Sequence, residues 1–136
     1  MKSAKSLIRI SNHEVETRQK RLAGLVEARM AAEMKLVMLE AEAVSENAHA
    51  AKDAEAGFYR IGFLQGWRMR RDAAKAAIET ARAEEAGARE ALTQAFEELK
   101  KYEQVLEMAR VAEALEDARR ETAALDELGL RRSQAR

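Results

Sequence analysis

The sequence predicts an all-α protein, a long antiparallel two-helix coiled-coil hairpin with a C-terminal helical overhang. Three observations predict this fold. A heptad repeat of apolar residues runs through the second half of the chain, helix-forming residues dominate a composition that contains no proline, and glycines and aromatics gather between two helical halves. We therefore expect residues 1–136 to form a single coiled-coil domain.

The heptad repeat occupies residues 64–109. One set of positions recurs every seven residues and a second set follows three residues after the first, the spacing of a helix that packs along one narrow stripe. Because the second set is mostly alanine, a facing helix is expected to approach closely and to bring the larger side chains. The positions, apolar except for an arginine and a glutamate, are Leu64, Trp67, Arg71, Ala74, Ile78, Ala81, Glu85, Ala88, Leu92, Ala95, Leu99, Tyr102, Leu106 and Ala109.

The facing helix is expected from the bulky apolar residues between 15 and 51, which form a band wider than a strict seam. Its methionines Met30, Met34 and Met38 are interpreted as core residues that fill gaps, with one of them exposed; the alternative is a soft, adaptable binding surface. The band comprises Leu22, Leu25, Val26, Met30, Met34, Leu36, Val37, Leu39, Val44 and Ala48.

Start and stop signals set the expected helix boundaries at about 3–56 and 63–128, with a turn at about 57–62 and a tail at 129–136. Ser11 and Glu14 match a capping box, but the sevenfold spacing through this region favours one helix with a weak point near Ser11. Gly57 is well suited to the position that follows the C-terminal end of a helix. Gly129 is too, with Leu130 folding back on the last turn, and the tail beyond it is predicted to be disordered.

Charge patterning predicts the register of the two helices. Pairing Glu40 with Arg82 and Glu33 with Arg89 centres the turn near residue 61. The same register sets residues 10–13 opposite residues 109–112, where the apolar heptad of the second helix fails. We therefore expect the second helix to extend beyond the first by several turns.

The composition gives little support for chemistry. Lys plus Arg and Asp plus Glu balance at 24 each, so no overall field argues for nucleic acid or a membrane, and cysteine is absent. Glu46, His49 and Asp53 have metal-ligand spacing on one helix face, but polar faces produce such triplets by chance, and the glycines match no phosphate-binding motif. We predict no catalytic, cofactor or metal site, and a cytoplasmic chain that is at most peripheral to a membrane.

Two other functions remain open from the residues alone. One is a generic coiled-coil adaptor or homodimer, in which the apolar band around Met30 to Leu39 binds a second hairpin. The other is an RNA-binding hairpin arm, in which basic and aromatic residues near the turn grip a single strand. The residues of that tip are Phe58, Tyr59, Arg60, Phe63, Trp67, Arg68, Arg70 and Arg71.

Three segments resemble the flagellar FliJ family, particularly its alphaproteobacterial branch. They are the start from Met1-Lys2-Ser3 to Leu7-Ile8-Arg9, the run Ala95-Phe96-Glu97-Glu98-Leu99-Lys100-Lys101-Tyr102-Glu103, and the close Ala124-Leu125-Asp126-Glu127-Leu128-Gly129-Leu130-Arg131-Arg132. The resemblance implies a hairpin similar to the central stalk of rotary ATPases. It implies a role in flagellar type III export at the cytoplasmic face of the basal body, with a hexameric export ATPase, an export gate protein and export chaperones as partners.

The open end of the hairpin is the expected docking surface for the ATPase. It combines apolar residues from both ends of the chain with a basic rim, the arrangement of a binding surface. The partner-binding residues that we predict are Leu7, Ile8, Arg9, Ile10, Leu115, Arg119, Arg120, Leu125 and Leu128.

Overall fold

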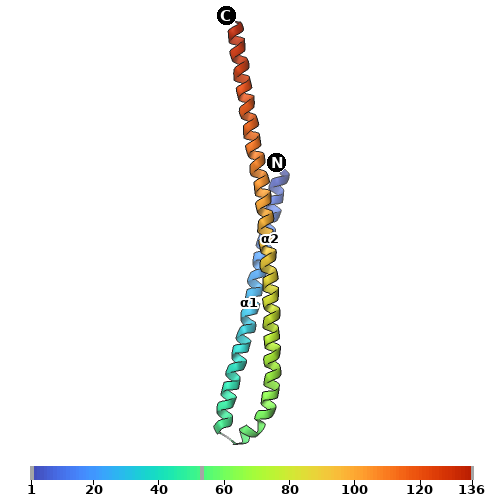
Figure 1. The fold of residues 1–136 in the computed structure, drawn as a ribbon, viewed down its shortest axis with the longest axis vertical. Coiled ribbons are helices and arrows are strands. Elements are labelled where there is room, and N and C mark those ends of the chain that lie inside the picture. Colours follow the sequence, from blue (N-terminus) through green and yellow to red (C-terminus); the bar gives the residue numbers. More distant parts are fainter. Residues whose placement is uncertain (1, 53, 136) are drawn as a thin grey trace. The chain divides into compact units, whose positions relative to one another are not determined.

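The computed structural model describes residues 2–52 and 54–135, without the side chains of residues 54, 56 and 57. Two helices account for nearly all of this part of the chain: α1 spans Lys2–Lys52 and α2 spans Ala54–Gln134 (Figure 1). The two long helices pack against each other as a helical hairpin, so the predicted all-α coiled-coil fold is confirmed.

Both helices contribute to two compact units. The arm unit, Glu16–Thr93, holds the connection between the helices and the antiparallel stretches that flank it. The terminal unit consists of Met1–Val15 and Gln94–Arg136, in which the start of α1 packs on the second half of α2. Each unit is held together by contacts between segments that lie far apart in the sequence.

The inner seam of α2 consists of the fourteen heptad positions predicted between residues 64 and 109. Every one of them is buried or half-buried, whereas almost all the other side chains in this stretch are exposed. Ala74, Ile78, Ala88, Ala95 and Leu99 are the best-buried apolar members. The seam is therefore confirmed position by position.

The inner seam of α1 is also a strict heptad, which corrects the wider band that the sequence suggested. A helix that packs against one partner needs only one stripe, and bulky residues outside that stripe stay exposed. Met30, Met34 and Met38 all lie outside it and are exposed, whereas only one of them was expected to be, so the interpretation of the other two as core is wrong. The positions of this heptad, all buried or half-buried, are Ala4, Ile8, Ser11, Val15, Arg18, Leu22, Leu25, Arg29, Ala32, Leu36, Leu39, Ala43, Glu46 and Ala50, and Glu14, Val26 and Glu33 beside it are half-buried as well.

The helix ends differ from those expected. α1 ends at Lys52 and α2 begins at Ala54, so the expected turn at 57–62 lies within α2. His49 and Lys52 in the last turn of α1, and Glu55 in the first turn of α2, complement the helix dipoles and favour a break here. The glycines beyond it are helical, since each costs only about 1 kcal/mol relative to alanine.

α2 likewise continues through the expected tail to Gln134. Gly129 has no positive φ and Leu130 is exposed, so no glycine cap forms there. An ion pair of 3.1 Å between Arg131 and Glu127 supports the last turns. At the other end α1 runs unbroken through Ser11, which is buried in the inner seam and does not cap a helix, as the predicted continuous helix requires.

The observed register is offset by one heptad from the predicted one. Arg82 lies opposite Glu33, at 3.4 Å, and not opposite Glu40, seven residues further along. Arg89 pairs with Glu85 of its own helix at 2.8 Å. The terminal unit shows the same offset, because Lys5 lies beside Leu106 to Glu113 where residues near 12 were expected. Charges that repeat every seven residues pair equally well after a slip of seven, so they cannot distinguish the two registers.

Candidate partner-binding surface

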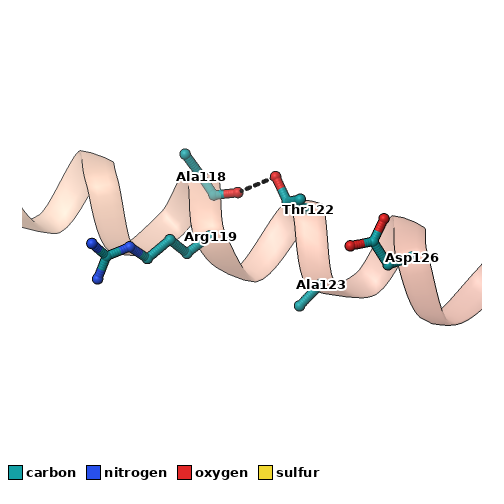
Figure 2. Close-up of a pocket in the computed structure, with 5 residues that line it drawn as sticks. All are labelled: Ala118, Arg119, Thr122, Ala123 and Asp126. Carbon is teal, nitrogen blue, oxygen red and sulfur yellow. Dashed lines mark hydrogen bonds between the residues drawn. The ribbon is translucent and has the colours of Figure 1, made fainter.

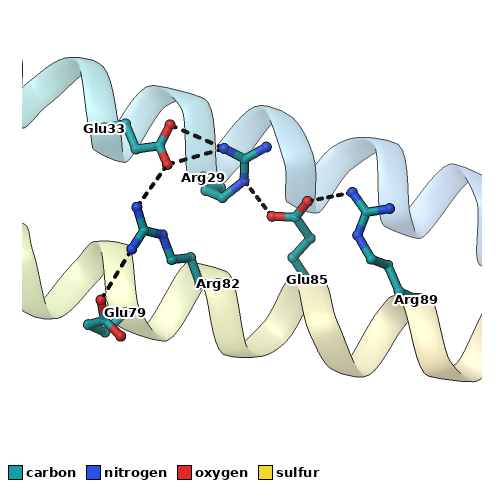
Figure 3. A network of polar contacts seen from close by, with 6 residues as sticks. All are labelled: Arg29, Glu33, Glu79, Arg82, Glu85 and Arg89. Atoms are coloured by element: carbon teal, nitrogen blue, oxygen red, sulfur yellow. Dashed lines mark hydrogen bonds and ion pairs between the residues drawn. The ribbon is translucent and has the colours of Figure 1, made fainter.

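A polar cluster fixes how the two helices of the arm unit meet (Figure 3). Glu85 occupies an inner-seam position of α2 and is only 7% exposed, yet Arg29 of the facing seam donates to its carboxylate. Arg29 also bonds Glu33 at 3.1 Å, and Arg82 bridges Glu33 and Glu79 at 3.4 and 3.5 Å. Opposite charges from the two helices thus meet within one layer, which specifies a single alignment.

The cluster shifts the pKa values of its central members. Hydrogen bonds from Arg89, and then from Arg29, hold the pKa of the Glu85 carboxyl below its ordinary value. Hydrogen bonds to Glu85, and then to Glu33, raise the pKa of Arg29. Both groups are therefore charged at neutral pH, where the ion pair links the two helices.

A second set of contacts lies nearer the connection. Trp67 donates its indole N–H to the backbone oxygen of Leu39 at 2.6 Å, and the guanidinium of Arg71 lies 5.3 Å from the centre of the Trp67 ring. Arg70 makes two hydrogen bonds to the carboxylate of Glu42, at 3.1 and 3.3 Å. Part of the basic and aromatic tip is therefore engaged within the arm unit.

The aromatic side chains next to the connection are exposed. Phe58 and Tyr59 meet edge to face with ring centroids 5.6 Å apart, and both project into solvent together with Ile61. Their exposure leaves the tip available to a partner, but the nearby Trp67, Arg70 and Arg71 serve the contact between the helices. The tip does not form one continuous stacking surface for a nucleic acid.

The overhang is the segment 111–135 of α2, in which every described side chain is exposed. Its apolar residues follow a new stripe, because Glu113 and Glu116 take over the inner-seam positions. Leu115 comes nine residues after Leu106, and Ala118 nine after Ala109, about 2.5 turns in each case. The stripe therefore lies on the opposite side of α2 from the inner seam. We call it the overhang stripe: Val111, Leu115, Ala118, Thr122 and Leu125.

The predicted partner-binding residues all belong to the terminal unit, but they form two sets. Leu7, Arg9 and Ile10 are exposed on α1, whereas Ile8 is half-buried in the inner seam. Leu115, Arg119, Arg120, Leu125 and Leu128 are exposed along the overhang. Leu125 comes ten residues after Leu115, about 15 Å along the helix, so the second set is a long face and not a compact end.

Figure 2 shows part of this face at close range. Its five lining residues come from one helix, so the surface is shallow and not an enclosed cavity. The Thr122 hydroxyl donates to the backbone oxygen of Ala118 at 3.0 Å, which satisfies its polarity within the stripe. The lining residues are Ala118, Arg119, Thr122, Ala123 and Asp126. Val111, Ala118 and Thr122 were not among the predicted partner-binding residues, although the 4-3 spacing of all three with the two leucines was a usable signal.

The rim of the overhang carries mixed charge, which modifies the expected basic rim. Arg120 lies 3.8 Å from both Glu116 and Asp117, and Arg131 pairs with Glu127. These pairs between neighbouring turns partly neutralise the arginines and leave the apolar stripe as the main feature of the surface.

Other kinds of site find little support in the described part of the chain. It contains no group of three His, Cys, Asp or Glu side chains placed to hold a metal ion, and Asp53, which shares metal-ligand spacing with Glu46 and His49, lies outside the described residues. Among the described helices, none is long and apolar enough to cross a membrane.

Comparison with known proteins gives one consistent result. A protein-family model described as "Flagellar FliJ protein" matches residues 1–136. Two relatives carrying that same description come from Caulobacter vibrioides, strains NA1000 / CB15N and ATCC 19089 / CIP 103742 / CB 15. Each is 53% identical to this chain over 132 residues, which cover 97% of this chain and 95% of the relative. No solved structure matches the chain.

Proposed function

Because the chain belongs to the flagellar FliJ family, we propose that it is a stalk-like component of flagellar protein export that binds and stimulates the type III export ATPase ring. The proposal extends to a link from the ring to the export gate protein and the export chaperones. It places the protein at the cytoplasmic face of the flagellar basal body.

The observation that carries the proposal is the overhang stripe. The overhang is a single helix with leucines on one side, and no described segment packs against them. It therefore has apolar area that a partner can bury. A helix about 12 Å wide suits insertion into a ring of subunits, one of which can cover its apolar stripe. The terminal unit also keeps Leu7 and Ile10 exposed on α1, so a ring that surrounds the overhang has a second apolar surface available.

The test is stimulation of the purified export ATPase by the parent chain and by a Leu115→Asp, Leu125→Asp variant. Both substitutions lie on exposed positions, so helicity by circular dichroism should be unchanged while most of the stimulation is lost. Ala124→Asp is the matched control, because Ala124 comes nine residues after Leu115 and lies on the other side of the helix. Equal stimulation by all three proteins would move the docking surface away from the overhang.

A further inference from the structure

The exposed methionines of α1 belong to a second heptad on that helix. Met30, Met34, Val37 and Val44 are 57%, 59%, 56% and 69% exposed, and Met38 beside them is 65% exposed. Together with two exposed alanines they repeat with alternating spacings of four and three, the signature of a coiled-coil seam. We call this set the outer seam: Met30, Met34, Val37, Ala41, Val44 and Ala48.

The outer seam faces away from α2. Met34, Ala41 and Ala48 each come nine residues, or about 2.5 turns, after an inner-seam residue, namely Leu25, Ala32 and Leu39. α1 therefore has two apolar stripes on opposite sides, of which the chain itself uses one. The outer seam ends at Glu27 on one side and at the end of α1 on the other.

We propose that the outer seam pairs with the outer seam of a second copy of this chain, with the two α1 helices antiparallel. A two-fold axis near residue 39 sets Met30 against Ala48 of the second copy, Met34 against Val44, and Val37 against Ala41. Two of these pairs combine a larger side chain with alanine and the third combines methionine with valine, so no layer sets two methionines or two alanines against each other. A parallel pairing in register sets methionine on methionine and alanine on alanine, and its layers are uneven.

The residues that flank the outer seam favour this antiparallel pairing along one edge of the seam and weaken it along the other. Met38 lies next to the axis and meets Met38 of the second copy, which adds apolar contact. Glu33 is compensated by Arg29 and Arg82 of its own chain. Glu40 meets Glu40 of the second copy across the axis, and this repulsion weakens the pair to a degree that depends on salt.

The size of the contact predicts a weak, reversible dimer. Five large side chains that expose roughly 100 Å² each form a patch of the size that is often functional on a monomer. Two copies then bury roughly 1,000 Å² in total, at the low end for specific interfaces. The outer seam lies wholly within the arm unit and shares no residue with the overhang stripe, so the inference does not depend on the proposed function.

The first experiment is analytical ultracentrifugation of the full chain from micromolar to millimolar concentration. The parent should show a concentration-dependent dimer, Val37→Asp should stay monomeric, and Glu40→Gln should dimerise more tightly than the parent. Val105→Asp, a substitution of a valine on α2 that is about half exposed, as Val37 is, serves as the matched control and should behave as the parent. A parent that is monomeric throughout, or a Val37→Asp variant that still dimerises, would overturn the proposal.

The second experiment fixes the orientation by disulfide formation, which is clean because the chain has no cysteine. Met30→Cys and Ala48→Cys chains should link to each other when mixed under mild oxidation, and neither should link efficiently on its own. Linking of each chain to itself but not to the other would show a parallel pair and reject the antiparallel arrangement.

Discussion

Glu85 shows how one residue can break the pattern of a seam and still belong to it. A carboxylate in the apolar stripe of α2 would oppose pairing if it had no partner, because burial of an uncompensated charge is costly. Arg29 reaches it from the facing helix and Arg89 from the following turn, so the charge is matched on both sides. The sequence predicted that Glu85 lies in the seam of α2, but it did not predict Arg29 as its partner. Arg29 is itself a seam residue, of α1, and the predicted band of α1 contained only apolar residues.

Acid should weaken the arm unit through this residue. The lowered pKa of Glu85 means that its contribution to stability is complete above the ordinary value near 4.5 and is lost as the pH falls through the lower value in the folded chain. Urea unfolding followed by the fluorescence of Trp67, the single tryptophan, should therefore show stability falling as the pH drops below the ordinary value near 4.5.

Glu85→Gln should be less stable than the parent at neutral pH and should lose less stability on acidification. Glu90→Gln, an exposed residue of the same helix, serves as the control. An identical acid response in the parent and in Glu85→Gln would show that Glu85 is not the titrating group that couples pH to pairing.

At the scale of the helices, the sequence predicted what each helix buries better than where it ends. The strict heptad of α2 reflects the geometry of two packed helices and could be read directly. The register could not be derived from the flanking charges, because a slip of seven residues preserves both the apolar stripe and the pairing of those charges; only the seam residues Arg29 and Glu85 distinguish the two registers. The end of α1 at Lys52 was missed because Gly57 and Gly62 suggested a turn, whereas both lie in α2.

The position of the connection can be tested with Gly62→Ala. Gly62 is helical, and a Cβ added to it would meet nothing within 4 Å. Alanine should therefore stabilise the chain by about 0.5–1 kcal/mol, seen as a higher midpoint in thermal unfolding. A turn with glycine in a left-handed conformation at this position predicts the opposite sign, so a destabilised variant would contradict the helical assignment.

For the whole molecule, the two units divide the exposed apolar residues between two tasks. The overhang stripe lies in the terminal unit and is proposed to bind the ATPase ring, whereas the outer seam lies in the arm unit and is proposed to bind a second copy. Sequence analysis located the first surface approximately, from the failure of the heptad after Ala109. The second surface was left open as an alternative, in which the apolar band around Met30 to Leu39 binds a second hairpin, because apolar residues on a long helix do not by themselves reveal which of two sides is used.

The two surfaces should therefore be separable by mutation. Val37→Asp should abolish self-association and leave the maximal stimulation of the ATPase unchanged, while Leu115→Asp, Leu125→Asp should do the reverse. Both measurements use the same four preparations: the parent, the two variants and the Val105→Asp control. Loss of both properties in either variant would mean that the surfaces are coupled.

The ion-paired layer at Arg29 and Glu85 also restricts how the arm can change in length during evolution. An insertion of seven residues into α1 between Arg29 and the connection takes Arg29 out of alignment with Glu85. The alignment is kept only if α2 also gains seven residues between the connection and Glu85. Matched insertions keep the layer intact and lengthen the arm by about 10 Å. Arms of related chains should accordingly differ by paired multiples of seven residues, and an unmatched insertion should be found only where this charged layer has been lost.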